Sequence, residues 1–120
     1  YLCTKAISMK NQKEILNKLG IAKLNAMQLE TISTIGKEDE VVLLSPTGSG
    51  KTLAFLLPII SQLDTSLEEV QALIVVPSRE LAIQIEQVIR EMGSGFKANA
   101  VYGGRAGSKD KIEIKTRIFK

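Results

Sequence analysis

Residues 41–52 read VVLLSPTGSGKT, and this stretch decides the fold. Its first four residues are all apolar, which predicts a strand buried on both faces, as strands of parallel sheets are. A glycine-rich loop, Ser45 to Gly50, follows at once, and Lys51-Thr52 opens the next segment. From Lys51 to about Leu63 apolar residues recur at spacings of three and four, which predicts a helix. We expect Pro58 to kink or shorten this helix.

A loop of this kind is suited to bind the phosphates of a nucleoside triphosphate, here expected to be ATP. Glycines let the backbone N–H groups turn inward around a bulky anion, and the start of the helix adds its dipole and free donors. Lys51 is expected to reach the β- and γ-phosphates, and the Thr52 hydroxyl is expected to bind Mg²⁺, so that these two residues form the predicted catalytic set. The alternative is a flexible glycine turn between strand and helix. The predicted phosphate-binding residues are Ser45, Pro46, Thr47, Gly48, Ser49, Gly50, Lys51 and Thr52.

Downstream of the loop, strand and helix continue to alternate. Residues 72–76 predict a second buried strand, which Pro77 closes, and Arg79 to Met92 predicts a helix. Ala98 to Tyr102 predicts a third strand that ends at Gly103-Gly104. The predicted apolar face of the long helix consists of Leu81, Ile85, Val88, Ile89 and Met92. Alternation of this kind predicts a parallel sheet with helices on both faces, joined by right-handed crossovers.

Upstream of the loop, two shorter helices are predicted. Ile15, Leu16 and Leu19 form an apolar stripe at helical spacing, and Gly20 is the expected stop. A second helix is predicted from about Ala26 to Ile35, ended by Gly36. Its expected apolar face consists of Leu29, Ile32 and Ile35. The residues from Lys37 to Glu40 are predicted to form a polar loop.

Composition sets limits on the function. The 120 residues are 44% hydrophobic and 24% charged, which fits one globular domain. With no histidine and a single cysteine, Cys3, the chain has no histidine-based zinc site, no Ser-His-Asp or Cys-His catalysis and no internal disulfide. No apolar run approaches the roughly 20 residues that cross a bilayer. We expect a soluble, cytoplasmic protein. A net charge of +3 permits contact with nucleic acid but is also explained by solubility alone.

Three further segments give the chain a family resemblance. It resembles the DEAD-box family of ATP-dependent RNA helicases. Gly20-Ile21 followed by Leu24 to Gln28 is similar to the Q motif of that family, which implies that Gln28 binds adenine. A carboxamide can donate and accept together along the N6 and N7 edge of adenine. The alternative is that Gln28 is a polar residue near a helix start. The family usually has proline and threonine where Leu24 and Asn25 stand, and the position of its adenine-covering aromatic residue falls on Cys3.

The second segment, Pro77 to Gln84, resembles motif Ia of the family, which contacts the RNA backbone. Ser78 is a favourable N-cap, and Arg79 adds a charged donor for a phosphate. The alternative is a capped surface helix with an Arg-Glu pair. Gly103-Gly104 resembles the paired-glycine motif of the family, although such a pair is also common in plain turns. The RNA-binding residues that the resemblance implies are Pro77, Ser78, Arg79, Gly103, Gly104 and Arg105.

Together these features predict an α/β, RecA-like P-loop fold, with residues 1–120 as a partial N-terminal RecA-like ATP-binding domain. The sequence contains no strand that ends in Asp-Glu-Ala-Asp, no Thr-Pro-Gly-Arg or Ser-Ala-Thr motif and no second RecA-like domain. We therefore expect the first half or so of one domain, cut short or incompletely covered, and inactive alone. The resemblance implies that the intact protein uses ATP and Mg²⁺ to remodel RNA between two RecA-like domains. The alternatives are a DNA-directed superfamily 2 helicase and a nucleotide-binding module without catalysis.

Overall fold

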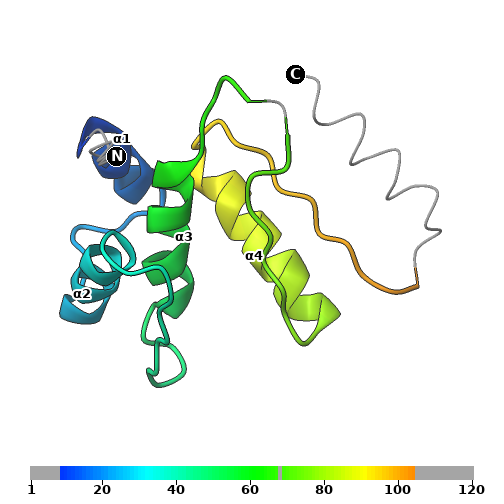
Figure 1. Cartoon of the computed structure of the whole chain (residues 1–120), viewed down its shortest axis with the longest axis horizontal. Helices are drawn as coiled ribbons and strands as arrows, with labels where there is room; N and C mark the ends of the chain where they lie inside the picture. The colour runs from blue at the N-terminus through cyan, green and yellow to red at the C-terminus, as the bar shows by residue number, and fades with distance from the viewer. Residues whose placement is uncertain (1–8, 68, 105–120) are drawn as a thin grey trace. The chain divides into compact units, whose positions relative to one another are not determined.

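The structure is a computed structural model that describes residues 9–67 and 69–104. These residues form four helices: α1 (Met9–Lys18), α2 (Ala26–Ile35), α3 (Lys51–Gln62) and α4 (Arg79–Met92) (Figure 1). The chain divides into two compact units, Tyr1–Gln62 with α1 to α3 and Leu63–Lys120 with α4. None of the helices in the described ranges is long and apolar enough to span a membrane.

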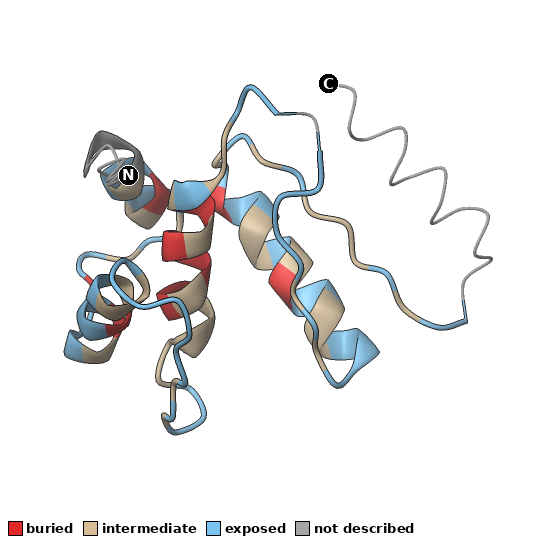
Figure 2. Ribbon diagram, in the orientation of Figure 1, coloured by how far each residue is buried: buried red, intermediate tan, exposed pale blue. Residues whose placement is uncertain are grey.

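In the first unit, α3 supplies most of the buried apolar side chains (Figure 2), and α2 packs against it. The predicted apolar face of α3 is confirmed. Its buried hydrophobic residues are Leu53, Ala54, Leu56, Leu57 and Ile60. Pro58 lies inside α3 and is itself buried, and the helix continues beyond it to Gln62. The proline therefore does not end the helix, which stops within one residue of its expected end.

The other two helices of this unit begin and end at local signals. α2 has the predicted bounds, with Asn25 as its N-cap and Gly36 as its C-cap. Its apolar face was predicted wrongly for Leu29, which is 55% exposed, whereas Gln28 and Thr31 are buried. These polar side chains can be buried because their polar atoms are hydrogen-bonded, such as the Thr31 hydroxyl to the Met27 carbonyl oxygen at 2.8 Å. α1 ends at Lys18, and Gly20 follows with φ 68°, in agreement with the expected stop.

In the second unit, α4 also has the predicted bounds. Ser78 caps its first turn, accepting a hydrogen bond from the Leu81 N–H at 3.2 Å, and Gly93 ends it in the left-handed conformation with φ 55°. Ile85 and Met92, two residues of the predicted apolar face, are buried. After the turn at residues 93–95 the chain runs back alongside α4 toward its N-terminal end (Figure 1).

The predicted strands are not formed in the described part of the chain. Residues 41–44, 72–76 and 98–102 have no strand structure, so the parallel sheet is not seen among the described residues. The predicted burial is wrong at the alternate positions Val42, Leu44, Leu73 and Val75, which are 84–89% exposed. A strand is stable only when a neighbouring strand takes up its backbone N–H and C=O groups, and these three segments have no such pairing in the described part of the chain.

Candidate nucleotide-binding site

The glycine-rich loop lies directly before α3, in the first unit. Gly48 and Gly50 have φ angles of 78° and 86°, a left-handed conformation that side chains other than glycine rarely adopt. A Cβ built on Gly48 meets no other atom within 4 Å, so the loop is open at this point. Lys51 is the first residue of α3, and the N–H groups of a first helical turn have no partner within the helix. The loop thus offers the free backbone donors that an anion requires.

The ammonium group of Lys51 folds back over this loop. Its Nζ donates hydrogen bonds to the carbonyl oxygen of Ser45 and, at 2.8 Å, to that of Pro46. The lysine thus bridges the first two residues of the loop from the start of α3. Phosphate oxygens are stronger acceptors for an ammonium than neutral carbonyl groups are, so a bound triphosphate can replace these contacts.

Two serine hydroxyl groups add hydrogen bonds within the loop. The Ser49 hydroxyl donates to the Pro46 carbonyl oxygen at 2.7 Å, and the Ser45 and Ser49 hydroxyls are hydrogen-bonded to each other. Ser45 stands at the position where the strict P-loop pattern has glycine, and here its side chain belongs to the internal bonding of the loop. The substitution is therefore compatible with a compact loop.

Gln28 and Asn25 connect the N-terminus of α2 to this loop. Their side chains form a capping box: the Asn25 Oδ1 accepts from the Gln28 N–H, and the Gln28 Oε1 accepts from the Asn25 N–H, both at 2.9 Å. The side-chain NH₂ groups of the same two residues donate to backbone carbonyl oxygens of the loop. Asn25 Nδ2 donates to the Ser49 carbonyl oxygen at 3.0 Å, and Gln28 Nε2 donates to the Gly50 carbonyl oxygen at 3.2 Å. The structure places Gln28 in the capping box at the start of α2, a position that is compatible with either reading. Its adenine contact stays a prediction.

Asn25 is a site residue that the sequence analysis missed. Its signal was present, because asparagine is among the most favourable N-cap residues and a glutamine three positions later completes a capping box. The same geometry explains Gly50. A Cβ at this position would lie 2.5 Å from Gln28 Nε2, so only glycine lets the carboxamide approach the loop.

Thr52, the predicted magnesium ligand, lies in the first turn of α3 and is half-buried. The described residues contain no group of three or more His, Cys, Asp or Glu side chains that could hold a metal ion by themselves. A single protein ligand such as the Thr52 hydroxyl fits a magnesium ion that arrives with phosphates. Mg²⁺ usually keeps several waters and takes few protein ligands beside phosphate oxygens.

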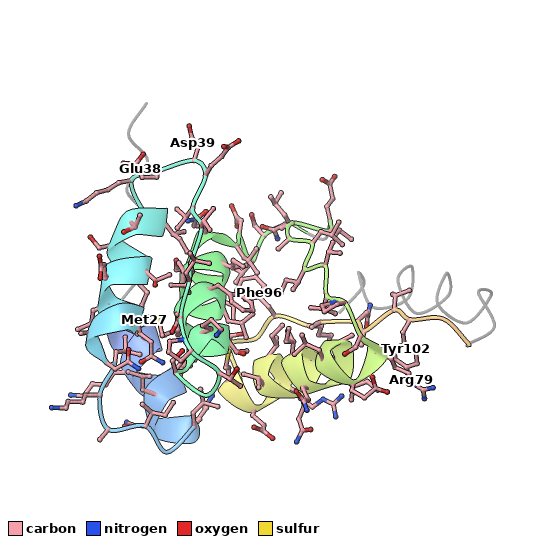
Figure 3. All side chains as sticks on the ribbon, turned by 90° about the horizontal axis from the view of Figure 1, so that it is seen from below. Met27, Glu38, Asp39, Arg79, Phe96 and Tyr102 are labelled. Atoms are coloured by element: carbon pink, nitrogen blue, oxygen red, sulfur yellow. The ribbon has the colours of Figure 1, made fainter. Side chains whose placement is uncertain are left out.

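The predicted RNA-binding residues lie in the second unit. The guanidinium of Arg79 lies over the ring of Tyr102, with the Arg79 Cζ 4.7 Å from the ring centroid (Figure 3). This contact places the first turn of α4 beside the turn at Gly103-Gly104, where Gly104 has φ 90°. Arg79 stacks on Tyr102 and forms no ion pair with a glutamate in the described ranges. Arg105 and Cys3 lie outside the described residues.

Comparison with known proteins agrees with the motifs. A sequence model described as "DEAD/DEAH box helicase" matches residues 25–119. Eukaryotic initiation factor 4A-3 of Arabidopsis thaliana is 36% identical over 98% of the chain, and this match covers 30% of the plant protein. ATP-dependent RNA helicase DeaD of Escherichia coli is 38% identical over 77% of the chain and 15% of its own length. Probable ATP-dependent RNA helicase YfmL of Bacillus subtilis is 38% identical over 84% of the chain and 27% of its own length.

The chain thus spans less than a third of each of these curated relatives. No solved structure matches the chain significantly. The family model nevertheless covers most of the sequence and includes the capping box, the glycine-rich loop and the Arg79–Tyr102 contact. The chain belongs to the DEAD/DEAH box helicase family.

Proposed function

We propose that this chain is the ATP- and RNA-binding part of a DEAD-box ATP-dependent RNA helicase, in which ATP binding and hydrolysis drive RNA duplex remodelling by the intact protein. The observation that carries the proposal is the position of the Lys51 ammonium, held over a loop with two left-handed glycines by the carbonyl oxygens of Ser45 and Pro46. Relatives named as ATP-dependent RNA helicases support the choice of RNA over DNA.

ATP phosphates are held, in this proposal, by the loop and the first turn of α3. Lys51 exchanges its two carbonyl acceptors for the β- and γ-phosphates, and the N–H groups at the start of α3 add further donors. The Thr52 hydroxyl ligates Mg²⁺, which neutralises phosphate charge when bound. Lys51 then holds the γ-phosphate in place, which makes it a catalytic residue together with Thr52. The contributing loop residues are Ser45, Pro46, Thr47, Gly48, Ser49 and Gly50.

Gln28 provides the base contact in this proposal. Both ends of its carboxamide are occupied in the structure, by the Asn25 N–H and the Gly50 carbonyl oxygen. Recognition of the adenine edge therefore competes with two internal hydrogen bonds, and each bond costs about 1 kcal/mol to give up without replacement. This competition, and the absence of the usual proline and threonine at Leu24 and Asn25, supports a weak preference for adenine.

RNA is contacted through its backbone, without sequence specificity, by the N-terminal end of α4 and the adjacent glycine turn. Arg79 supplies a charged donor, and α4 presents the N–H groups of its first turn. The Gly103-Gly104 turn allows a close approach of backbone to backbone. The proposed RNA-binding residues remain Pro77, Ser78, Arg79, Gly103, Gly104 and Arg105.

We further propose that residues 1–120 belong to a single RecA-like domain in which residues 41–44, 72–76 and 98–102 pair into a parallel sheet. Their alternating apolar side chains, 84–89% exposed at Val42, Leu44, Leu73 and Val75, are the surface that such a sheet would bury under helices. A second RecA-like domain completes the site in the intact protein, whose location is cytoplasmic.

Titration of the chain with ATP and Mg²⁺ by isothermal calorimetry tests the nucleotide site. Lys51→Ala should weaken binding by about 1.5–3 kcal/mol, the usual contribution of a charge-assisted hydrogen bond. Lys37→Ala is the matched control, because Lys37 is an exposed lysine in the loop after α2. Equal affinity of the Lys51 variant and the unaltered chain would contradict the proposal.

The rival functions are separated by measurements on the intact protein. ATP hydrolysis stimulated by single-stranded RNA and not by DNA of the same sequence supports the proposed helicase. Stimulation by DNA alone would favour a DNA-directed superfamily 2 helicase. ATP binding with no hydrolysis under either condition would favour a non-catalytic nucleotide-binding module.

A further inference from the structure

The stacked pair Arg79 and Tyr102 connects two segments that the sequence analysis treated separately. Arg79 is the first residue of α4, and Tyr102 directly precedes the Gly103-Gly104 turn. The guanidinium lies over the ring with 4.7 Å between the Arg79 Cζ and the ring centroid (Figure 3). Such a distance is well inside the roughly 6 Å over which a cation is attracted by an aromatic face.

The local fold brings the two residues together. Ser78 fixes the start of α4, and Gly93 and Gly95, both at positive φ, reverse the chain after the helix ends at Met92. The following residues run back beside α4, so that Tyr102 arrives at its N-terminal end (Figure 3). The contact therefore depends on both ends of the helix and not on one flexible side chain meeting another by chance.

The stack restrains a side chain that is otherwise free to move. Arg79 is exposed, and it forms no ion pair with any residue that the structure describes. An exposed arginine samples many rotamers, and this conformational entropy is lost when the side chain is fixed on a phosphate. Stacking uses the flat face of the guanidinium and leaves the N–H donors at its edge available. An arginine held in this way is prepared for a bidentate contact with a phosphate.

We propose that Tyr102 is a positioning residue that holds Arg79 in the orientation in which it binds an RNA phosphate. The proposal rests on the RNA-binding role of Arg79 given above.

The test is a double-mutant cycle on the full chain. Fluorescence anisotropy with a labelled oligouridylate measures the Kd at several salt concentrations. Tyr102→Leu should weaken RNA binding about two- to fivefold, the value of an exposed cation–π contact, and Tyr102→Phe should restore it because the aromatic face is retained. Phe96→Leu is the control, because it removes an aromatic ring from the same segment that runs back beside α4.

The cycle separates positioning from mere packing. In an Arg79→Gln background, Tyr102→Leu should change the Kd by less than a factor of about 1.5, because nothing remains to be positioned. An equal loss in both backgrounds would show that Tyr102 acts through packing and would overturn the inference. An unchanged Kd for RNA in the Tyr102→Leu variant would also overturn the inference.

Salt dependence distinguishes this failure from a failure of the proposed RNA site. Arg79→Gln should reduce the slope of log Kd against log salt by about one, because one phosphate contact is lost, whereas Tyr102→Leu should leave the slope unchanged. If Arg79→Gln alters neither affinity nor slope, the RNA role of Arg79 is wrong and the inference falls with it. If Arg79→Gln acts as expected and Tyr102→Leu does not, only the positioning role is overturned.

Discussion

The side-chain Nε2 of Gln28 donates a hydrogen bond to the carbonyl oxygen of Gly50, at 3.2 Å, while the Oε1 of the same carboxamide accepts from the Asn25 N–H at 2.9 Å. The residue that resembles an adenine-binding glutamine thus bonds both to the start of α2 and to the glycine-rich loop. Gln28 is buried, with 6% of its surface exposed, so neither bond is readily replaced by water.

Gln28→Ala should therefore change stability as well as nucleotide choice. Losing both hydrogen bonds, one of which is half of the capping box, should lower the free energy of unfolding by about 1–3 kcal/mol. The modest preference for ATP over GTP should disappear at the same time. Urea unfolding and competition between the two nucleotides measure the two effects. If the unaltered chain binds GTP as well as ATP, and Gln28→Ala changes neither Kd, the adenine role is wrong and the capping role alone remains.

Asn25→Asp should separate the helix cap from the loop contact. Aspartate keeps the acceptor that caps the Gln28 N–H but lacks the amide donor that reaches the Ser49 carbonyl oxygen. The Tm should stay close to that of the unaltered chain, because aspartate is as good an N-cap as asparagine. Amide exchange in residues 45–50 should become faster.

Asn25→Ala is the matched variant for this experiment, since it removes both contacts. It should lower stability by about 1 kcal/mol in addition to loosening the loop. Unchanged exchange of the loop in both variants would mean that the Asn25–Ser49 hydrogen bond does not hold the loop.

Gly50→Ala should be more harmful than Gly48→Ala, although both glycines have positive φ angles. Each substitution introduces backbone strain of roughly 1–2 kcal/mol. Only at Gly50 does the new Cβ also meet Gln28 Nε2, at 2.5 Å, whereas the space around Gly48 is open. We expect Gly50→Ala to lose stability and ATP affinity together. Equal unfolding free energies for the two variants would argue that Gln28 does not pack against the loop.

The helices were predicted well because their signals are local. α4 is capped by Ser78 before its first residue and by Gly93 after its last, and both caps bond to backbone groups within one turn. The same holds for α2 between Asn25 and Gly36. Burial of residues 41–44 and 72–76 was predicted wrongly, because the burial of a strand depends on neighbours that its own sequence does not specify.

The site was predictable as a set of residues but not as a set of contacts. The order of apolar run, glycine loop and Lys51-Thr52 located the loop, yet the spacing could not show that the Lys51 ammonium bonds to its own loop carbonyls. Asn25 was noticed only as a departure from the family pattern, although it donates to Ser49. The Arg79–Tyr102 stack joins residues that are far apart in the sequence, and no local sequence pattern predicts such a contact.

Leu73→Lys tests the proposed sheet. In the 120-residue chain Leu73 is 85% exposed, so a lysine should leave the unfolding free energy unchanged to within about 0.5 kcal/mol. In the intact protein the proposed sheet buries this position, and an unpaired buried charge should cost at least about 3 kcal/mol. Glu69→Gln is the control for the change of charge, because it also raises the net charge by one at an exposed position. A neutral effect of Leu73→Lys in the intact protein would contradict the sheet.

The last prediction is that these 120 residues alone do not hydrolyse ATP. Phosphoryl transfer needs a held Mg²⁺, a positioned water and neutralisation of the γ-phosphate charge. Lys51 and Thr52 supply part of the Mg²⁺ binding and part of the charge neutralisation. The sequence contains no apolar strand that ends in an acidic motif to position the water.

The exposed carboxylates of Glu38 and Asp39 do not fill this gap. The N-terminal cap of α2 contacts the glycine-rich loop, whereas these two residues follow the C-terminal end of the helix (Figure 3). A helix of ten residues is about 15 Å long. A steady-state ATPase assay on the chain and on Lys51→Ala, each with and without RNA, should give the same background rate in all four samples. Turnover that is lost in Lys51→Ala would show that a carboxylate elsewhere in these 120 residues positions the attacking water.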